Sequence, residues 1–255
     1  MLLCADIGNT NIVLGCFRDE DLVFSSRIST DRTRLKDQYA VDIGSILSLY
    51  CISTDDINES IISSVVPVLT EPVSYAIELV TGSYPMVLGP GMKTGLNIKI
   101  DNPAQLGSDF VACAVAAKEK YPTPLIVIDM GTATTISVID KNGDFLGCSI
   151  LPGLHISTDA LVINSSLLTR ISYEAPPSVI GKNTNDSMQS GVIYGAAATL
   201  DGLCYRIFDE LGENASIVAT GGLSSVIIPH CRVDIILDNM LLLDGLRMIY
   251  HRNKR

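Results

Sequence analysis

The sequence has few of the residues that build metal centres and disulfide frameworks. It contains three histidines, and its seven cysteines are scattered without a Cys-x-x-Cys pair. Zinc sites and secreted disulfide scaffolds need closely spaced sets of these residues. We therefore expect reduced thiols in the protein interior and no zinc site.

Basic charge is also scarce. Lys and Arg number 18 against 28 Asp and Glu, which gives a formal net charge of −10. Such a charge repels nucleic-acid backbones and anionic membrane surfaces, so we expect neither as a partner. A protein of this charge that handles phosphates has to hold them with cations or backbone N–H groups.

Long apolar runs are missing as well. Uncharged apolar stretches such as residues 145–158 contain polar residues and fall short of the roughly 20 residues that span a bilayer. Asp6 stands too close to the first residue for the apolar segment of a signal peptide. We therefore expect a cytoplasmic protein.

The most informative feature is an internal repeat. Residues 2–14 and residues 125–137 each contain an apolar run, an Asp-x-Gly turn with threonine close behind, and a second apolar run. Asp129 lies 123 residues after Asp6, close to half the chain. Each copy predicts a β-hairpin, and a turn signal after it leads into a third strand.

Alternating helices and strands follow each predicted three-stranded meander. Residues 36–50 have the apolar spacing of an amphipathic helix, and residues 60–66 read as a strand. This pattern predicts an α/β protein of two lobes, each with a mixed sheet flanked by helices. Because charged and proline residues interrupt the pattern before the second copy, we expect lobes at 1–118 and 119–255.

The repeated turns suit phosphate. A glycine at the bend exposes backbone N–H groups to an anion without steric bulk. Asp6 and Asp129 would repel a phosphate directly, so in such a site they act through a bound cation or its water shell. A single turn of this kind is more often a structural hairpin, but the duplication favours the phosphate interpretation.

Two further segments are weaker signals. The apolar run 217–219 leads through Thr220 into Gly221-Gly222, where adenine or ribose could approach the backbone, although paired glycines more often serve a turn. Asp109 stands in the first turn of a helix predicted from Ser108 to about Lys120. Favourable placement at the positive end of the helix dipole is the alternative explanation for that carboxylate.

Together these segments resemble the type III pantothenate kinases over essentially the whole chain. The matching motifs are residues 6–10, 89–96, 129–133, 151–154 and 219–223. The resemblance implies a duplicated actin-like (ribonuclease H-like) fold, similar to that of acetate and sugar kinases. It also implies a homodimer that uses ATP, Mg²⁺ and a monovalent cation, K⁺ or NH₄⁺, to phosphorylate pantothenate to 4′-phosphopantothenate, the first step of coenzyme A biosynthesis.

The resemblance also implies residue roles. Asp109 would be the general base, Asp129 the ligand of the monovalent cation, and Asp6 a magnesium ligand, directly or through water. Thr184 would face pantothenate from the partner subunit. The expected ATP-binding residues are Asp6, Ile7, Gly8, Asn9, Thr10, Asn11, Ile12, Val13, Thr132, Gly221 and Gly222. The expected substrate-binding residues are Ile100, Gly107, Ser108, Asp109, Phe110 and Thr184.

Two positions depart from the family pattern. Phe110 stands where the family has an Arg that contacts the carboxylate of pantothenate, and Ile100 stands where it usually has a Tyr. One reading is a pantothenate kinase whose substrate carboxylate is held by another group, such as Lys93 or Lys99. The others are a kinase for a different, less anionic hydroxyl substrate and a non-catalytic, nucleotide-binding regulatory homologue.

Overall fold

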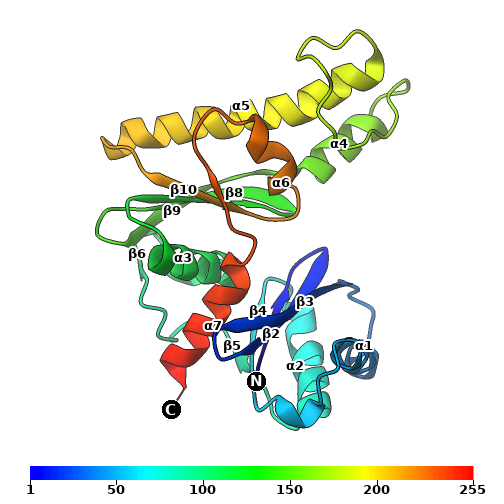
Figure 1. Ribbon diagram of the computed structural model, residues 1–255, viewed down its shortest axis with the longest axis vertical. Coiled ribbons are helices and arrows are strands. Elements are labelled where there is room, and N and C mark those ends of the chain that lie inside the picture. Colours follow the sequence, from blue (N-terminus) through cyan, green and yellow to red (C-terminus); the bar gives the residue numbers. More distant parts are fainter. Residues whose placement is uncertain (255) are drawn as a thin grey trace. The chain divides into compact units, whose positions relative to one another are not determined.

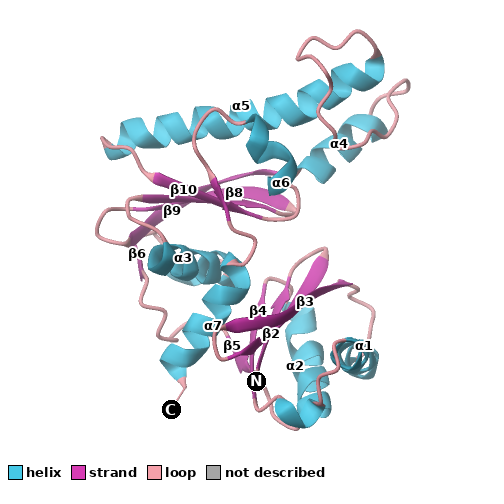
Figure 2. Cartoon of the chain, viewed as in Figure 1, coloured by secondary structure: helices cyan, strands magenta, loops and turns pink. Residues whose placement is uncertain are grey.

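Two mixed sheets organise the chain in the computed structural model, which describes residues 1–254 (Figure 1, Figure 2). The first compact unit comprises Met1–Leu96, Asn102–Ala116 and the described residues from Leu241 onward, and the second comprises Asn97–Asp101 and Ala117–Met240. The expected division at residue 118 follows the sequence repeat, whereas contacts group the end of the chain with the first unit.

The sheet of the first unit begins with the predicted antiparallel meander. Two parallel strands then extend it on the other side of β1, which gives the order β3-β2-β1-β4-β5. The strands are β1 (Leu2–Ile7), β2 (Asn11–Arg18), β3 (Asp21–Ser29), β4 (Glu59–Ser64) and β5 (Met86–Val87).

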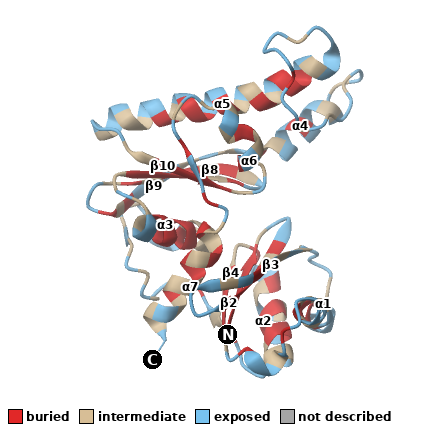
Figure 3. Ribbon diagram, viewed as in Figure 1, coloured by how far each residue is buried: buried red, intermediate tan, exposed pale blue. Residues whose placement is uncertain are grey.

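Helices lie on both faces of this sheet. The cluster around Leu3, Ala5 and Ile7 packs against α1 and α2, while α7 lies on the other face (Figure 3). There Leu243 approaches Gly15. The helices of this unit are α1 (Lys36–Leu49), η1 (Thr54–Asp56), α2 (Pro67–Thr81), η2 (Pro103–Gln105), α3 (Ser108–Lys120, whose last turn belongs to the second unit) and α7 (Leu241–Asn253).

The second unit repeats the same plan. Its strand order, β11-β10-β7-β8-β9-β6, contains an antiparallel meander with parallel strands added beyond β7. The strands are β6 (Asn97–Ile98), β7 (Leu125–Met130), β8 (Ala133–Ile139), β9 (Asp144–Pro152), β10 (Ser216–Thr220) and β11 (Ile236–Leu237). The helices are α4 (Leu154–Ile163), α5 (Thr184–Leu211), α6 (Ser224–Ile227) and η3 (Ile228–His230).

The duplication predicted from the repeat is therefore confirmed. β1 and β7 are equivalent strands, each between an antiparallel and a parallel neighbour, and each carries its aspartate next to its last residue. In the parallel pairing, Asp6 stands opposite Ser63 and Asp129 opposite Thr220. Since parallel strands end at the same edge of a sheet, each aspartate lies at the edge where α/β proteins bind ligands.

Other expectations are confirmed only in part. The predicted apolar face of α1 is buried at Tyr39, Ile43 and Leu47. Four of the seven cysteines are buried, but Cys51 and Cys148 are exposed, so the expectation of interior thiols is wrong for these two.

Within residues 1–254, every helix is too short or too polar to span a bilayer.

Candidate active site

The first Asp-x-Gly turn joins β1 to β2. Asp6 is 7% exposed, and the hydroxyl of Ser63 donates a hydrogen bond to its Oδ1. Gly8 donates its N–H to the carbonyl of Asn11 at 3.0 Å. A Cβ at Gly8 would lie 2.9 Å from that carbonyl oxygen and 3.9 Å from Asp6 Oδ2, so the turn closes tightly only around glycine, with the carboxylate beside it.

The segment after β3 braces this turn. Thr30 donates from its Oγ1 to the carbonyl of Gly8 at 2.7 Å and from its N–H to the carbonyl of Thr10 at 3.0 Å. Arg32 donates to the side chain of Asn9 at 3.0 Å. The exposed turn is thus held from outside the hairpin.

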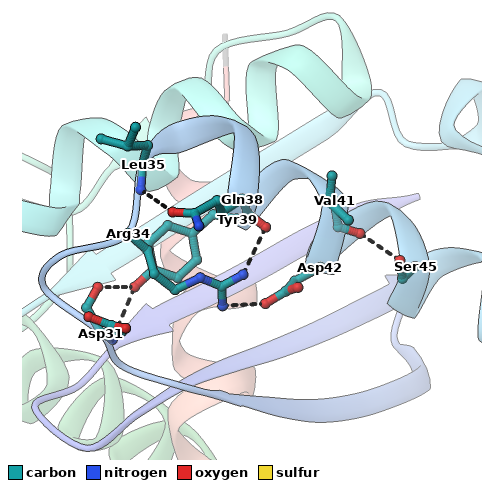
Figure 4. A network of polar contacts seen from close by, with 8 residues as sticks. All are labelled: Asp31, Arg34, Leu35, Gln38, Tyr39, Val41, Asp42 and Ser45. Atoms are coloured by element: carbon teal, nitrogen blue, oxygen red, sulfur yellow. Dashed lines mark hydrogen bonds and ion pairs between the residues drawn. The ribbon is translucent and has the colours of Figure 1, made fainter.

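A polar network in turn fastens this segment to α1 (Figure 4). Tyr39 donates its hydroxyl to the carbonyl of Asp31 at 2.8 Å, and Arg34 pairs with Asp42 at 2.5 Å. The side chain of Gln38 accepts the N–H of Leu35 at 2.9 Å. Thr30 and Arg32 adjoin this network, so the packing of α1 helps to hold the first turn in place.

The residues of the first turn that are expected to bind ATP differ in their solvent exposure. Ile7 and Ile12 are fully buried, so a ligand can reach only their backbone. Val13 is partly buried, whereas Asn9 to Asn11 are exposed. Backbone N–H groups and short polar side chains are therefore the donors that this turn offers.

Ser108 fastens the start of α3 to the end of β4. Its hydroxyl accepts the N–H of Ser64 at 3.0 Å and lies 3.1 Å from the carbonyl oxygen of Ser64, to which it donates. Asn102, which precedes Pro103, caps η2 by accepting the N–H of Ala104. These contacts place the next residue, Asp109, in the first turn of α3 beside the carboxyl end of the first sheet.

The carboxylate of Asp109 folds back over this helix start. Its Oδ1 accepts the N–H of Phe110 at 2.8 Å, and a Cβ at Gly107 would lie 2.4 Å from the same oxygen. Burial raises the pKa of the Asp109 carboxyl, and the hydrogen bonds from the backbone N–H groups of Phe110 and Asp109 oppose that rise. A carboxylate with a raised pKa is a stronger base than an ordinary aspartate.

The second turn, between β7 and β8, has the same form. Gly131 donates its N–H to the carbonyl of Ala133 at 3.1 Å, and a Cβ at Gly131 would lie 3.7 Å from Asp129 Oδ1. Asp129 is partly buried, whereas Gly131 and Thr132 are exposed. This turn also presents backbone beside a carboxylate.

Two glycine segments far along the chain pack against this second turn. Gly153 donates its N–H to the carbonyl of Thr132 at 3.2 Å, and a Cβ there would lie 2.2 Å from that oxygen. Gly221 has a φ of 100°, and its Cβ would lie 2.6 Å from the backbone of Met130. The structure thus brings the 151–154 and 219–223 motifs together at Asp129, with the exposed Gly222 next in the chain.

The remaining predicted residues lie apart from these turns in the chain. Ile100 is partly buried and belongs to the second unit, whereas Phe110 belongs to the first. Thr184 is the exposed first residue of α5, which Asn183 caps, and it lines a cavity of about 670 Å³. The walls of that cavity come from β8, β9, α4, α5 and neighbouring residues, and they are mainly apolar.

The two lysines considered as carboxylate partners are differently placed. Lys93 is exposed, and both its backbone N–H and its carbonyl are bonded by the side chain of Asn253 at 2.9 Å. Lys99 pairs with Asp144 at 3.6 Å.

The sequence interpretation missed Ser63, Ser64 and Thr30, whose only signal was hydroxyl side chains at strand ends.

A family model of the type III pantothenate kinases matches residues 2–206. This chain belongs to the type III pantothenate kinase family. A type III pantothenate kinase from Citrifermentans bemidjiense is 44% identical to it over 254 residues, covering 100% of each chain. The resemblance inferred from the motifs is therefore confirmed.

Solved structures agree with the family's fold. A Baf family transcriptional activator from Campylobacter jejuni is 20% identical, with a TM-score of 0.61 and 98% of each chain covered. An activator of 2-hydroxyisocaproyl-CoA dehydratase from Clostridium difficile, solved with bound ADPNP, is 12% identical, with a TM-score of 0.58 over 99% of this chain and 95% of that one. At these identities the likeness concerns the fold alone, and it confirms the duplicated actin-like fold.

Asp109→Asn should raise the unfolding temperature at pH 7. The folded-state pKa of Asp109 lies above the unfolded value of about 3.9, so ionisation costs stability as pH rises through the folded-state pKa. Asn keeps an acceptor for the N–H of Phe110 and carries no charge. Thermal unfolding of both proteins from pH 7 downward should show a difference that shrinks towards pH ~4. A lower unfolding temperature for Asp109→Asn at pH 7 would instead indicate a carboxylate that stabilises the helix start.

Proposed function

We propose that this protein transfers the γ-phosphoryl group of ATP to the primary hydroxyl of pantothenate, giving 4′-phosphopantothenate. The observation that carries the proposal is the base-like carboxylate of Asp109, fastened through Ser108 to the carboxyl end of the first sheet, in a member of this kinase family. Full-length similarity to pantothenate kinases favours this function over a different substrate or a regulatory role.

Asp109 acts as the general base in this proposal. It accepts the proton of the pantothenate hydroxyl as that oxygen attacks the γ-phosphorus in line with the leaving ADP oxygen. Gly107 leaves room for the carboxylate, and the N–H of Phe110 orients one of its oxygens. Since phosphoryl transfer passes through a loose transition state, positioning of the two reactants supplies much of the catalysis.

The two turns and the glycine pair bind ATP in this proposal. Backbone N–H groups of the two turns, with Thr132 beside the second, donate to phosphate oxygens. Gly221 and Gly222 leave their backbone open to the nucleoside. The fold neighbour from Clostridium difficile was solved with ADPNP, which supports a nucleotide site on this fold.

Both aspartates fit cations. A carboxylate that is buried, like Asp6, or half-buried, like Asp129, beside a phosphate-binding turn is compatible with bound phosphate only when a cation lies between them, directly or through water. We assign Mg²⁺ to Asp6 and a monovalent cation, K⁺ or NH₄⁺, to Asp129. When bound, these cations neutralise charge on the phosphates.

We further propose that the protein is a cytoplasmic homodimer. The segment from α4 to α5 exposes Ile163, Leu167 and Ile180 by 80%, 90% and 78% of their surface. Apolar exposure of this density marks an interaction surface, and a second copy would cover it while bringing Thr184 to the partner's substrate. Elution of the active enzyme as a monomer would contradict this assembly.

The function is tested with purified protein, ATP, Mg²⁺, K⁺ and pantothenate. We expect 4′-phosphopantothenate by mass spectrometry, and Asp109→Asn should reduce turnover by about 10² to 10⁴ because general-base catalysis contributes on that scale. ATP binding, measured by calorimetry, should persist in the variant. If product forms without dependence on K⁺ or NH₄⁺, the monovalent cation has no part in the reaction. If no product forms while ATP binding is intact, another substrate or a regulatory role is favoured.

The departures from the family pattern give a gain-of-function prediction. Ile100→Tyr combined with Phe110→Arg should raise kcat/KM for pantothenate by about 30- to 1000-fold, since a planar guanidinium fork and a hydroxyl donor together contribute roughly 2–4 kcal/mol to carboxylate recognition. The KM for ATP should not change. Phe110→Arg alone is the control. It should gain less than the double variant, because an Arg beside Asp109 also lowers the pKa of the base. An unchanged kcat/KM in the double variant would mean that another group already binds the carboxylate.

A further inference from the structure

Two buried serines of β4 differ in what their hydroxyl groups do. Ser63 is fully buried and donates to Asp6 Oδ1. Ser60, on the same strand and 5% exposed, has a buried hydroxyl with no hydrogen-bond partner among the described residues. A polar group buried in a strand usually costs stability unless it is bonded. Unlike that of Ser60, the hydroxyl of Ser63 has a hydrogen-bond acceptor, and this acceptor is a carboxylate of the candidate site.

The bond fixes which way the carboxylate of Asp6 turns. With Oδ1 held by Ser63, Oδ2 lies on the side of the Gly8 turn, 3.9 Å from where a Cβ of Gly8 would stand. Asp6 and Ser63 are direct partners in the parallel pairing of β1 and β4, so the strand register itself brings them together.

The second half of the duplicated fold carries a hydroxyl residue at the same place. Thr220 is 5% exposed and is the register partner of Asp129 in the pairing of β10 with β7. Both aspartates of the duplication thus stand opposite a buried hydroxyl residue on the adjacent parallel strand.

We propose that Ser63 is a positioning residue that orients the Asp6 carboxylate for the Mg²⁺ of Mg²⁺–ATP. The proposal rests on the proposed function in so far as Asp6 serves Mg²⁺, but it concerns cation affinity and not the identity of the phosphate acceptor. Groups that orient a metal ligand from behind typically change metal affinity or activity by 10- to 100-fold when they are removed.

The test uses the full-length protein and a non-hydrolysable ATP analogue, adenylyl imidodiphosphate. Calorimetry of analogue binding over a range of Mg²⁺ concentrations gives the Mg²⁺ midpoint without pantothenate. Ser63→Ala should raise that midpoint by about tenfold or more. Ser63→Thr should bring it back towards the wild-type value, because a threonine occupies the equivalent place in the second half.

Ser60→Ala is the matched control. It removes a buried hydroxyl from the same strand, but one that contacts no polar partner, so its Mg²⁺ midpoint should equal that of the wild type. A rise in Ser60→Ala as large as that in Ser63→Ala would show a general effect of strand β4 and would overturn the proposal.

A double-mutant cycle shows whether Ser63 acts through Asp6. In Asp6→Asn, which should itself raise the midpoint, the further change Ser63→Ala should add nothing, since the group it orients is already gone. Additive effects would overturn the positioning role. If Ser63→Ala does not fold, Ser63→Cys replaces it, because a thiol is of similar size and only a weak donor.

The outcomes separate this proposal from the proposed function. A wild-type midpoint in folded Ser63→Ala or Ser63→Cys overturns the role of Ser63, whatever the enzyme phosphorylates. Failure of the wild-type protein to phosphorylate pantothenate overturns the proposed function, while the Mg²⁺ midpoints still decide the role of Ser63.

Discussion

The parallel pairing of β1 with β4, repeated by β7 with β10, is the constraint on which the candidate site depends. It ends neighbouring strands at one edge of each sheet and sets each aspartate opposite a buried hydroxyl residue. In the first unit, the same strand end also receives Ser108, and with it the start of α3. One strand end therefore positions both the carboxylate proposed to bind a cation and the proposed general base.

Glycine has a different purpose in each motif. At Gly8 it permits a tight turn, and at Gly107 it leaves space for the carboxylate of Asp109. Gly153 and Gly221 allow two distant segments to pack directly on the backbone around Met130 to Thr132. Any side chain at the last two positions would push those segments away from the second turn, so the motif glycines shape the proposed nucleotide site.

The electrostatics of the protein follow from its acidity. With an excess of acidic residues, the protein is proposed to bind phosphates through backbone donors at the turns and through cations held by carboxylates. Burial raises the pKa of the Asp109 carboxyl, which suits it to accept a proton. In the proposed mechanism this aspartate is the base, whereas Asp6 and Asp129 bind cations.

The sequence by itself determined the local parts of this protein. The two Asp-x-Gly turns, the meanders, the amphipathic helix α1 and the helix start at Ser108 all depend on near neighbours, and their motifs sufficed to indicate the family. Only the tertiary structure decided that Ser63 meets Asp6, 57 residues away, that Gly153 and Gly221 converge on the second turn, and that α7 completes the first unit. Such contacts arise from strand register and from the packing of distant segments, which local periodicity does not encode.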